Sequence, residues 1–147
     1  MEQHFQKKFN HLKELCSQKG LRLTHQRTEV LRELASAKDH PSAETLYSRV
    51  KGRVPAISLD TVYRTLGTFM DLGLAAKVPV DGDLGRFDGD VSPHHHVVCV
   101  CCGAIRDFIW DEVSCGELPA EVTDWCHVTD TQVIVRGICR DCKGSDS

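Results

Sequence analysis

Apolar residues recur at helical spacing through the first half of the chain and predict four helices. Thr24, Ser42 and Ser58 each precede such a stretch and are candidate N-caps. Gly20 and Gly73 are candidate stops, because glycine readily adopts the left-handed backbone that ends many helices. The predicted helices comprise a first one that ends near residue 20 and three more over residues 25–37, 43–51 and 59–72. Their expected inward faces contain Phe5, Phe9, Leu12, Val30, Leu31, Leu34, Leu46, Val50, Val62, Leu66, Phe69 and Met70.

The pattern changes after residue 73, where a short hairpin is predicted. Residues 74–80 and 84–88 have the character of strands, and Asp81-Gly82-Asp83 between them is a typical hairpin turn. Three or four compact helices followed by such a hairpin form a winged helix-turn-helix, whose last helix enters the major groove of DNA. The alternative is a helical bundle with a hairpin and no DNA-binding role.

Short runs rich in β-branched residues dominate the second half and predict strands over residues 95–101, 104–109 and 128–138. Pro119 is expected at the first position of a short helix that runs to about Trp125. The Gly-Asp-Val-Ser-Pro segment 89–93 breaks both periods and is the predicted hinge. The predicted fold is α+β, with an N-terminal winged helix-turn-helix domain over residues 1–88 and a small C-terminal α/β domain over residues 94–147.

Composition and charge narrow the range of partners. The chain has 147 residues, enough for one or two small domains. Residues 1–80 contain 13 basic and 8 acidic residues, whereas residues 81–147 contain 5 and 13, so an anionic partner such as DNA is favoured at one end only. The sequence contains neither a long apolar run nor an apolar signal core at its start. We therefore expect a cytoplasmic protein without membrane contact.

Eight cysteines in a compartment that keeps thiols reduced favour metal binding over disulfides. Cys99-x-x-Cys102 and Cys139-x-x-Cys142 each follow a predicted strand, and two such pairs supply the four thiolates of a tetrahedral structural zinc site. The alternatives are two reduced turns or a redox pair, although neither motif is expected to open a helix as in thioredoxin-like proteins. Cys101 could compete for the place of Cys102. The cysteines outside the two motifs, Cys16, Cys101, Cys115 and Cys126, are expected to be buried apolar thiols.

A second set of possible ligands stands next to the first cysteine motif. His94 and His96 are two residues apart, so on a strand their side chains point to the same side. With Asp107 they form an imidazole–carboxylate group, which suits Fe(II), Mn(II), Zn(II) or Ni(II) better than copper(I). His40 and Asp88 are more distant candidates, which spacing alone does not attach to this group.

Several motifs, in order along nearly the whole chain, make it resemble the ferric uptake regulator family of bacterial metal-dependent repressors. The matching segments are Leu23-Thr24-His25-Gln26-Arg27, His40-Pro41-Ser42-Ala43, residues 58–66, Arg86-Phe87-Asp88, residues 94–103 and residues 137–142. Aspartate at positions 88 and 107 is typical of the peroxide-responsive (PerR) branch, whereas the iron-uptake branch usually has glutamate. Thr131 stands where many members have a histidine of a third metal site, so the resemblance does not extend to such a site.

The resemblance implies a winged-helix DNA-binding domain followed by an α/β dimerisation domain. It implies structural zinc on Cys99, Cys102, Cys139 and Cys142. It implies a regulatory Fe(II) or Mn(II) site on His40, Asp88, His94, His96 and Asp107, where iron and peroxide would oxidise His40 and His94. The expected DNA contacts are Arg22, Gln26, Arg27, Ser58, Thr61, Tyr63 and Arg64.

The leading hypothesis is a homodimeric, non-enzymatic repressor that binds a palindromic DNA operator and has peroxide as its only small-molecule signal. The alternative is a repressor of the same family that responds to iron supply. A metalloenzyme built on His94, His96 and Asp107 would need a general base and an open coordination position, and the sequence shows no separate base motif. A zinc adaptor with no DNA role would leave the basic first half unexplained.

Overall fold

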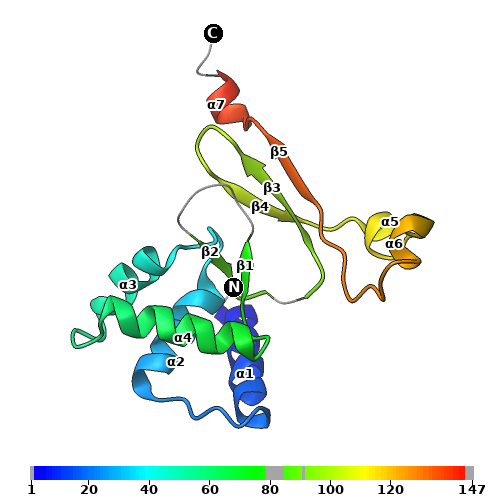
Figure 1. Ribbon diagram of the computed structural model, residues 1–147. Coiled ribbons are helices and arrows are strands. Elements are labelled where there is room, and N and C mark those ends of the chain that lie inside the picture. Colours follow the sequence, from blue (N-terminus) through cyan, green and yellow to red (C-terminus); the bar gives the residue numbers. More distant parts are fainter. Residues whose placement is uncertain (1, 79–84, 91, 145–147) are drawn as a thin grey trace. The chain divides into compact units, whose positions relative to one another are not determined.

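A computed structural model describes residues 2–78, 85–90 and 92–144 of the chain (Figure 1). The chain divides into two units, Met1–Val91 and Ser92–Ser147, which are called here the N-unit and the C-unit. The boundary falls within the segment 89–93, whose role as a hinge stays a prediction. Within the described ranges, none of the helices combines the length and the apolar character that a membrane span requires.

Four helices make up most of the N-unit, and polar side chains cap three of them. The helices are α1 (Glu2–Gln18), α2 (His25–Ser36), α3 (Ala43–Lys51) and α4 (Leu59–Asp71). The side chains of Thr24, Ser42 and Ser58 accept hydrogen bonds from the backbone N–H three residues later, at 3.2, 3.2 and 3.1 Å. Gly20 and Gly73 follow α1 and α4 with φ of 75° and 72°. The four predicted helices and their caps are confirmed.

One apolar core joins these four helices. Among its most deeply buried members are Phe9, Leu31, Leu46, Leu66 and Phe69, which come from all four helices. Of the predicted inward residues, only Phe5 and Met70 are partly exposed, and both pack against this core. The core therefore fixes α4 with its apolar face inward and its polar face available to a partner.

A short antiparallel hairpin completes the N-unit. It consists of β1 (Ala76–Val78) and β2 (Arg86–Asp88), with Lys77 opposite Phe87. The Phe87 side chain is buried in the helical core and anchors β2 to it. The predicted turn at residues 81–83 lies outside the described residues. Helices and hairpin together form the winged helix-turn-helix predicted from the sequence.

A three-stranded sheet forms the centre of the C-unit. Its strands β3 (His95–Cys99), β4 (Ile105–Phe108) and β5 (Ile134–Gly137) lie in the order β4-β3-β5. The antiparallel pairing of β3 with β4 sets His96 opposite Asp107. The parallel pairing of β3 with β5 brings the carboxyl ends of both strands to one edge of the sheet. Each of these two ends leads into a cysteine motif.

The short elements of the C-unit differ from those predicted. The helix α6 (Ala120–Thr123) is shorter than expected, and Pro119 is its N-cap rather than its first residue. The helices α5 (Asp111–Ser114) and α7 (Arg140–Gly144) have no counterpart among the predicted elements, and the predicted strand 128–138 is reduced to β5. Elements of four or five residues contain too few apolar positions to display a period.

Candidate metal centres and nucleic-acid surface

Four cysteine sulfurs gather at one edge of the C-unit sheet. Cys99 ends β3, Cys102 lies in the following turn, Cys139 directly precedes α7, and Cys142 lies within it. Their Sγ atoms all lie within 4.8 Å of one another, and the Cys99–Cys142 and Cys102–Cys139 pairs are each 3.9 Å apart. The second motif opens the short helix α7, but no strand follows α7 among the described residues, so the motif does not lie in the βαβ unit of thioredoxin-like proteins. The gathering of all four sulfurs also disfavours an isolated redox pair.

Hydrogen bonding within this cluster favours one thiolate and disfavours another. The backbone N–H groups of Cys102 and Cys139 donate to Sγ of Cys99, at 3.4 and 3.3 Å. These two donors lower the pKa of the Cys99 thiol to about 6. Hydrogen bonding with the Cys139 thiol, and next with that of Cys101, raises the pKa of Cys142. A divalent cation would stabilise all four as thiolates, so the donor set fits tetrahedral structural zinc.

The other cysteines lie outside the four-sulfur cluster. Cys102, rather than its neighbour Cys101, is a member of the four-sulfur group. Cys16 is buried in the N-unit core as expected, and Cys126 is partly buried. The same expectation is wrong for Cys101 and Cys115, which are exposed because they lie in turns after β3 and α5.

In the N-unit, His40 and Asp88 form a buried imidazole–carboxylate pair. Nε2 of His40 lies 3.4 Å from Oδ2 of Asp88, and the two side chains are only 5% and 9% exposed. His40 belongs to the loop before α3, and Asp88 ends β2. The backbone N–H of Asp90 donates to Oδ1 of Asp88 at 2.8 Å, which fixes the orientation of the carboxylate. Spacing alone did not connect these two residues, but the fold brings them together.

In the C-unit, His94, His96 and Asp107 form a second imidazole–carboxylate group. The Nε2 atoms of the two histidines are 3.1 Å apart. Oδ1 of Asp107 lies 3.7 Å from Nε2 of His94 and 3.3 Å from Nε2 of His96. The i, i+2 spacing predicted that both imidazoles point to the same side, and the pairing of β3 with β4 adds the carboxylate.

Hydrogen bonds at the opposite ring nitrogens orient these two histidines. Nδ1 of His94 lies 2.6 Å from the carbonyl oxygen of Ser92, so it carries the proton and donates it. Nδ1 of His96 lies 3.3 Å from the side-chain amide of Gln132. The Ser92 contact fixes the ring of His94 and leaves the lone pair on its Nε2, the nitrogen that would bind an ion. The Gln132 contact orients the ring of His96. Imidazole nitrogens with a carboxylate oxygen are a donor set that fits Fe(II) or Mn(II).

His95, which the sequence left without a role, is a structural residue. It is fully buried, and its ring packs at a tilt on that of Phe108, with 5.5 Å between ring centroids. Nδ1 accepts a hydrogen bond from the backbone N–H of Val133 at 2.9 Å, so the proton resides on Nε2. Nε2 then donates to Oγ of Ser114 at 2.8 Å. His95 thus ties β3 to α5 and to the segment that enters β5.

Replacing His95 with alanine is expected to lower the free energy of unfolding by about 2–4 kcal/mol, because it removes two hydrogen bonds and opens a cavity. His127→Ala, at an exposed position, is the matched control and should change stability by less than about 0.5 kcal/mol. Urea unfolding of the zinc-loaded protein measures both variants. Equal losses in the two variants would contradict the structural role of His95.

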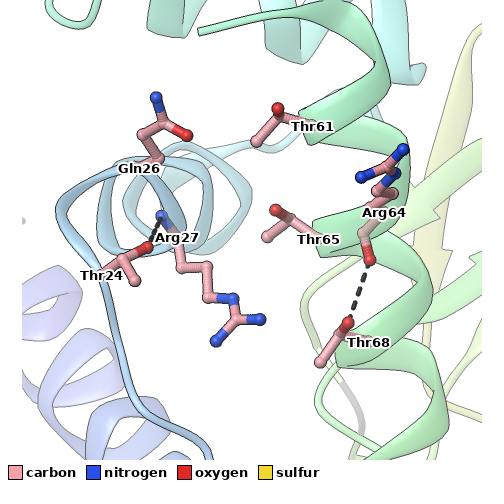
Figure 2. Close-up of a pocket in the computed structure, with 7 residues that line it drawn as sticks. All are labelled: Thr24, Gln26, Arg27, Thr61, Arg64, Thr65 and Thr68. Atoms are coloured by element: carbon pink, nitrogen blue, oxygen red, sulfur yellow. Dashed lines mark hydrogen bonds between the residues drawn. The ribbon is translucent and has the colours of Figure 1, made fainter.

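A polar pocket of about 290 Å³ lies between the start of α2 and the exposed face of α4. Figure 2 shows Thr61 and Thr65 directed from α4 toward α2, with the Arg27 side chain extending between the two helices. The lining residues are Thr24, Gln26, Arg27, Thr61, Arg64, Thr65 and Thr68. They include two guanidinium groups and several hydroxyls but no carboxylate. Such a lining suits an anionic group such as a phosphate.

The pocket contains some of the seven expected DNA contacts. Four of them, Gln26, Arg27, Thr61 and Arg64, line it. Arg22 precedes α2, and its carbonyl oxygen accepts a hydrogen bond from Arg27 at 2.9 Å. Ser58 is the N-cap of α4, and Tyr63 is an exposed residue of that helix. That these residues contact DNA stays a prediction.

Three threonines of the pocket were not among the expected contacts, namely Thr24, Thr65 and Thr68. Thr24 was recognisable only as a cap, and Thr68 only as an outward position of α4.

The Tyr63 hydroxyl donates a hydrogen bond to the carboxylate of Glu44, which raises the pKa of Tyr63 and holds its ring against α3. A carboxylate 19 residues away in the chain could not be paired with Tyr63 from the sequence.

A model of the ferric uptake regulator family matches residues 18–133 of the chain. This segment contains both imidazole–carboxylate groups, the pocket and the first cysteine motif. It ends before Cys139 and Cys142, so the participation of these two residues rests on the geometry of the four sulfurs.

Individual relatives agree with this match. The chain is 35% identical over 127 residues to the peroxide-responsive repressor PerR of Staphylococcus epidermidis, with 84% of this chain and 83% of that protein covered. Among solved structures, a zinc-bound manganese uptake regulator is similar with a TM-score of 0.67 and 27% identity, over 87% of this chain and 98% of that one. PerR from Streptococcus pyogenes, described in terms of peroxide sensing and gene regulation, has a TM-score of 0.53 and 29% identity, with 91% and 92% covered.

Proposed function

The chain belongs to the ferric uptake regulator family, and we propose that it is a metal-dependent transcriptional repressor that senses peroxide. The observation that carries this proposal is the presence of one imidazole–carboxylate group in each unit. The N-unit group is His40 with Asp88, and the C-unit group is Asp107 with two histidines, His94 and His96. A relative that is 35% identical to this chain is named a peroxide-responsive repressor. Members of the family regulate transcription rather than catalyse reactions, and we infer the same role for this chain, acting on DNA in the cytoplasm.

We assign structural zinc to the four-sulfur cluster. Zinc held by Cys99, Cys102, Cys139 and Cys142 would join the carboxyl ends of β3 and β5. Thiolates bind zinc tightly and complete its tetrahedron, so this ion would stay in place while another ion exchanges.

We assign the regulatory ion, Fe(II) or Mn(II), to His40, Asp88, His94, His96 and Asp107. An ion that takes ligands from both units would favour one arrangement of them, and this differential affinity is what a metal-controlled switch requires. Ferrous iron, when bound, supplies the electron that reduces peroxide and generates an oxidant of nearby imidazoles. Oxidation of His40 or His94 would remove a ligand and weaken the favoured arrangement. Manganese in the same place would support repression without oxidising these histidines.

Regulators of this family bind DNA as dimers, and surfaces of both units suit that assembly. The C-unit exposes large apolar side chains, as association requires: Val100, Ile109, Trp110, Trp125, Val135 and Ile138. A two-fold dimer would present two α4 helices to successive major grooves of a palindromic operator. The polar pocket beside α4 would then receive a backbone phosphate.

Arg64→Ala is expected to weaken operator binding by about tenfold to a hundredfold, corresponding to about 1–3 kcal/mol. The Arg64 side chain is 81% exposed on α4, lines the pocket and forms an ion pair with Asp60 at 2.9 Å. Binding is measured by fluorescence anisotropy with a duplex selected from random sequence by the manganese-loaded protein. Lys143→Ala, which removes an exposed charge from the C-unit, is the control. Unchanged affinity of Arg64→Ala, with metal content equal to wild type, would exclude Arg64 from the DNA surface.

A further inference from the structure

His40 has a backbone conformation that side-chain-bearing residues rarely adopt. Its φ is +51°, and it is the only non-glycine residue with positive φ in the described part of the chain. This left-handed conformation is unfavourable for a residue with a Cβ atom and persists only where the surroundings enforce it. The same residue presents its imidazole to Asp88. The loop that contains His40 is therefore held in place by other contacts.

Those contacts come from β2, and Arg86 makes two of them. The guanidinium of Arg86 donates through Nε to the carbonyl oxygen of His40 and through Nη2 to that of Asp39, the latter at 2.6 Å. The backbone N–H of the next residue, Phe87, donates to the carbonyl oxygen of Pro41 at 3.0 Å. Three successive carbonyl groups of the loop are thus bonded to two successive residues of β2.

The strand that holds the loop also supplies the carboxylate. Asp88 follows Arg86 and Phe87 in β2, so the imidazole and the carboxylate of the pair are positioned by one continuous strand. Phe87 is buried in the helical core, which makes β2 a rigid support. A change at Arg86 would free the His40 backbone without touching either ligand side chain.

We propose that Arg86 is a positioning residue of the regulatory metal site, which sets the affinity for a divalent ion by holding His40 in its left-handed conformation. The inference rests on the proposed function, because it takes His40 and Asp88 as ligands. The contacts of Arg86 shown here are with backbone carbonyl groups of the loop. Its effect on the ion comes from preorganisation, since a loop that must be ordered on binding weakens affinity.

The chemistry of this contact requires arginine. A planar guanidinium can donate to two adjacent carbonyl oxygens at once, whereas the ammonium group of lysine is a compact charge without that fork. A second arginine offers a comparison within the same loop. Arg49 of α3 donates hydrogen bonds to the side-chain carboxylate of Asp39, at 2.6 and 3.2 Å, rather than to the backbone carbonyl groups of the loop.

The test compares Arg86→Gln and Arg86→Lys with the control Arg49→Gln, all in the full-length zinc-loaded protein. Manganese binding is measured by the electron paramagnetic resonance signal of the free ion, without peroxide and well below the unfolding temperature. Arg86→Gln is expected to bind manganese at least about tenfold more weakly, Arg86→Lys to be intermediate, and Arg49→Gln to stay within about twofold of wild type. Wild-type affinity in Arg86→Lys and Arg86→Gln, or equal losses in all three variants, would overturn the proposal.

Hydrogen exchange of the Phe87 amide in metal-free protein supplies a second readout, independent of any ion. Loss of the Arg86 contacts should accelerate this exchange at least about tenfold, while amides of α2 keep their wild-type rates. Unchanged Phe87 protection in Arg86→Lys would overturn the proposed hold even if Arg86→Gln fails to fold. If wild-type protein does not bind manganese while the Phe87 result is as expected, the proposed regulatory metal site is contradicted. The role of Arg86 in ordering the His40 loop is then still supported.

Discussion

Cys142→Ser is expected to abolish stoichiometric zinc binding and with it the cooperative unfolding of the C-unit. Among the described residues of this unit, the buried apolar side chains are those of Cys99 and Ile105 alone, so its own core is small. A unit of this size needs a metal or a partner to be stable. Structural zinc contributes about 10–16 kcal/mol of apparent binding free energy in small domains, which far exceeds what so few buried side chains supply.

The matched control for this variant is Cys101→Ser. It makes the same chemical change at an exposed thiol that hydrogen-bonds with Cys142 but is not one of the four clustered sulfurs. Zinc per chain is measured by mass spectrometry of the intact protein under native conditions, and assembly by light scattering. We expect about one zinc per chain and a dimer for wild type and Cys101→Ser, and neither for Cys142→Ser. A zinc-bound dimer in Cys142→Ser would contradict the four-thiolate assignment.

Local physical chemistry made the N-unit predictable from sequence. Thr24, Ser42 and Ser58 satisfy backbone N–H groups at helix starts, and Gly20 and Gly73 adopt the conformation that ends helices. Between these signals, apolar residues at helical spacing face one shared core. Local preference and tertiary packing agree there, so the sequence pattern predicts the helices almost to the residue.

The C-unit was less predictable, because its order depends on contacts between distant residues. Its helices α5, α6 and α7 have four or five residues each and no periodic apolar face. His95 becomes structural only because Ser114 and Val133 supply its two hydrogen bonds. Nothing within a few residues of His95 distinguishes it from its neighbours.

The candidate metal sites depend partly on local sequence patterns and partly on contacts between distant residues. Strand alternation placed His94 and His96 on one side, and the CxxC spacing indicated a thiolate site. The contribution of His40 and Asp88 came only from the resemblance to a family. Their proximity depends on the left-handed turn at His40 and on Arg86, 46 residues away, and no local pattern encodes that contact.

Treatment of iron-loaded protein with hydrogen peroxide is expected to lower its operator affinity by roughly 5- to 150-fold, the usual range of coupling between two sites. The loss follows because oxidised imidazole no longer donates to the ion that favours the DNA-binding arrangement. Manganese-loaded protein should keep its affinity under the same treatment. A repressor that responds to iron supply alone would also bind DNA with either metal but would show no such difference.

The most direct test of peroxide sensing is the mass of the peptides that contain His40 and His94 after this treatment. Iron-loaded protein is predicted to gain the mass of one oxygen atom on His40 or His94 in proportion to the loss of DNA binding. Manganese-loaded protein should gain none, and the structural His95 should stay unmodified in both. A gain confined to cysteines, or equal histidine oxidation with both metals, would contradict the proposed sensing mechanism.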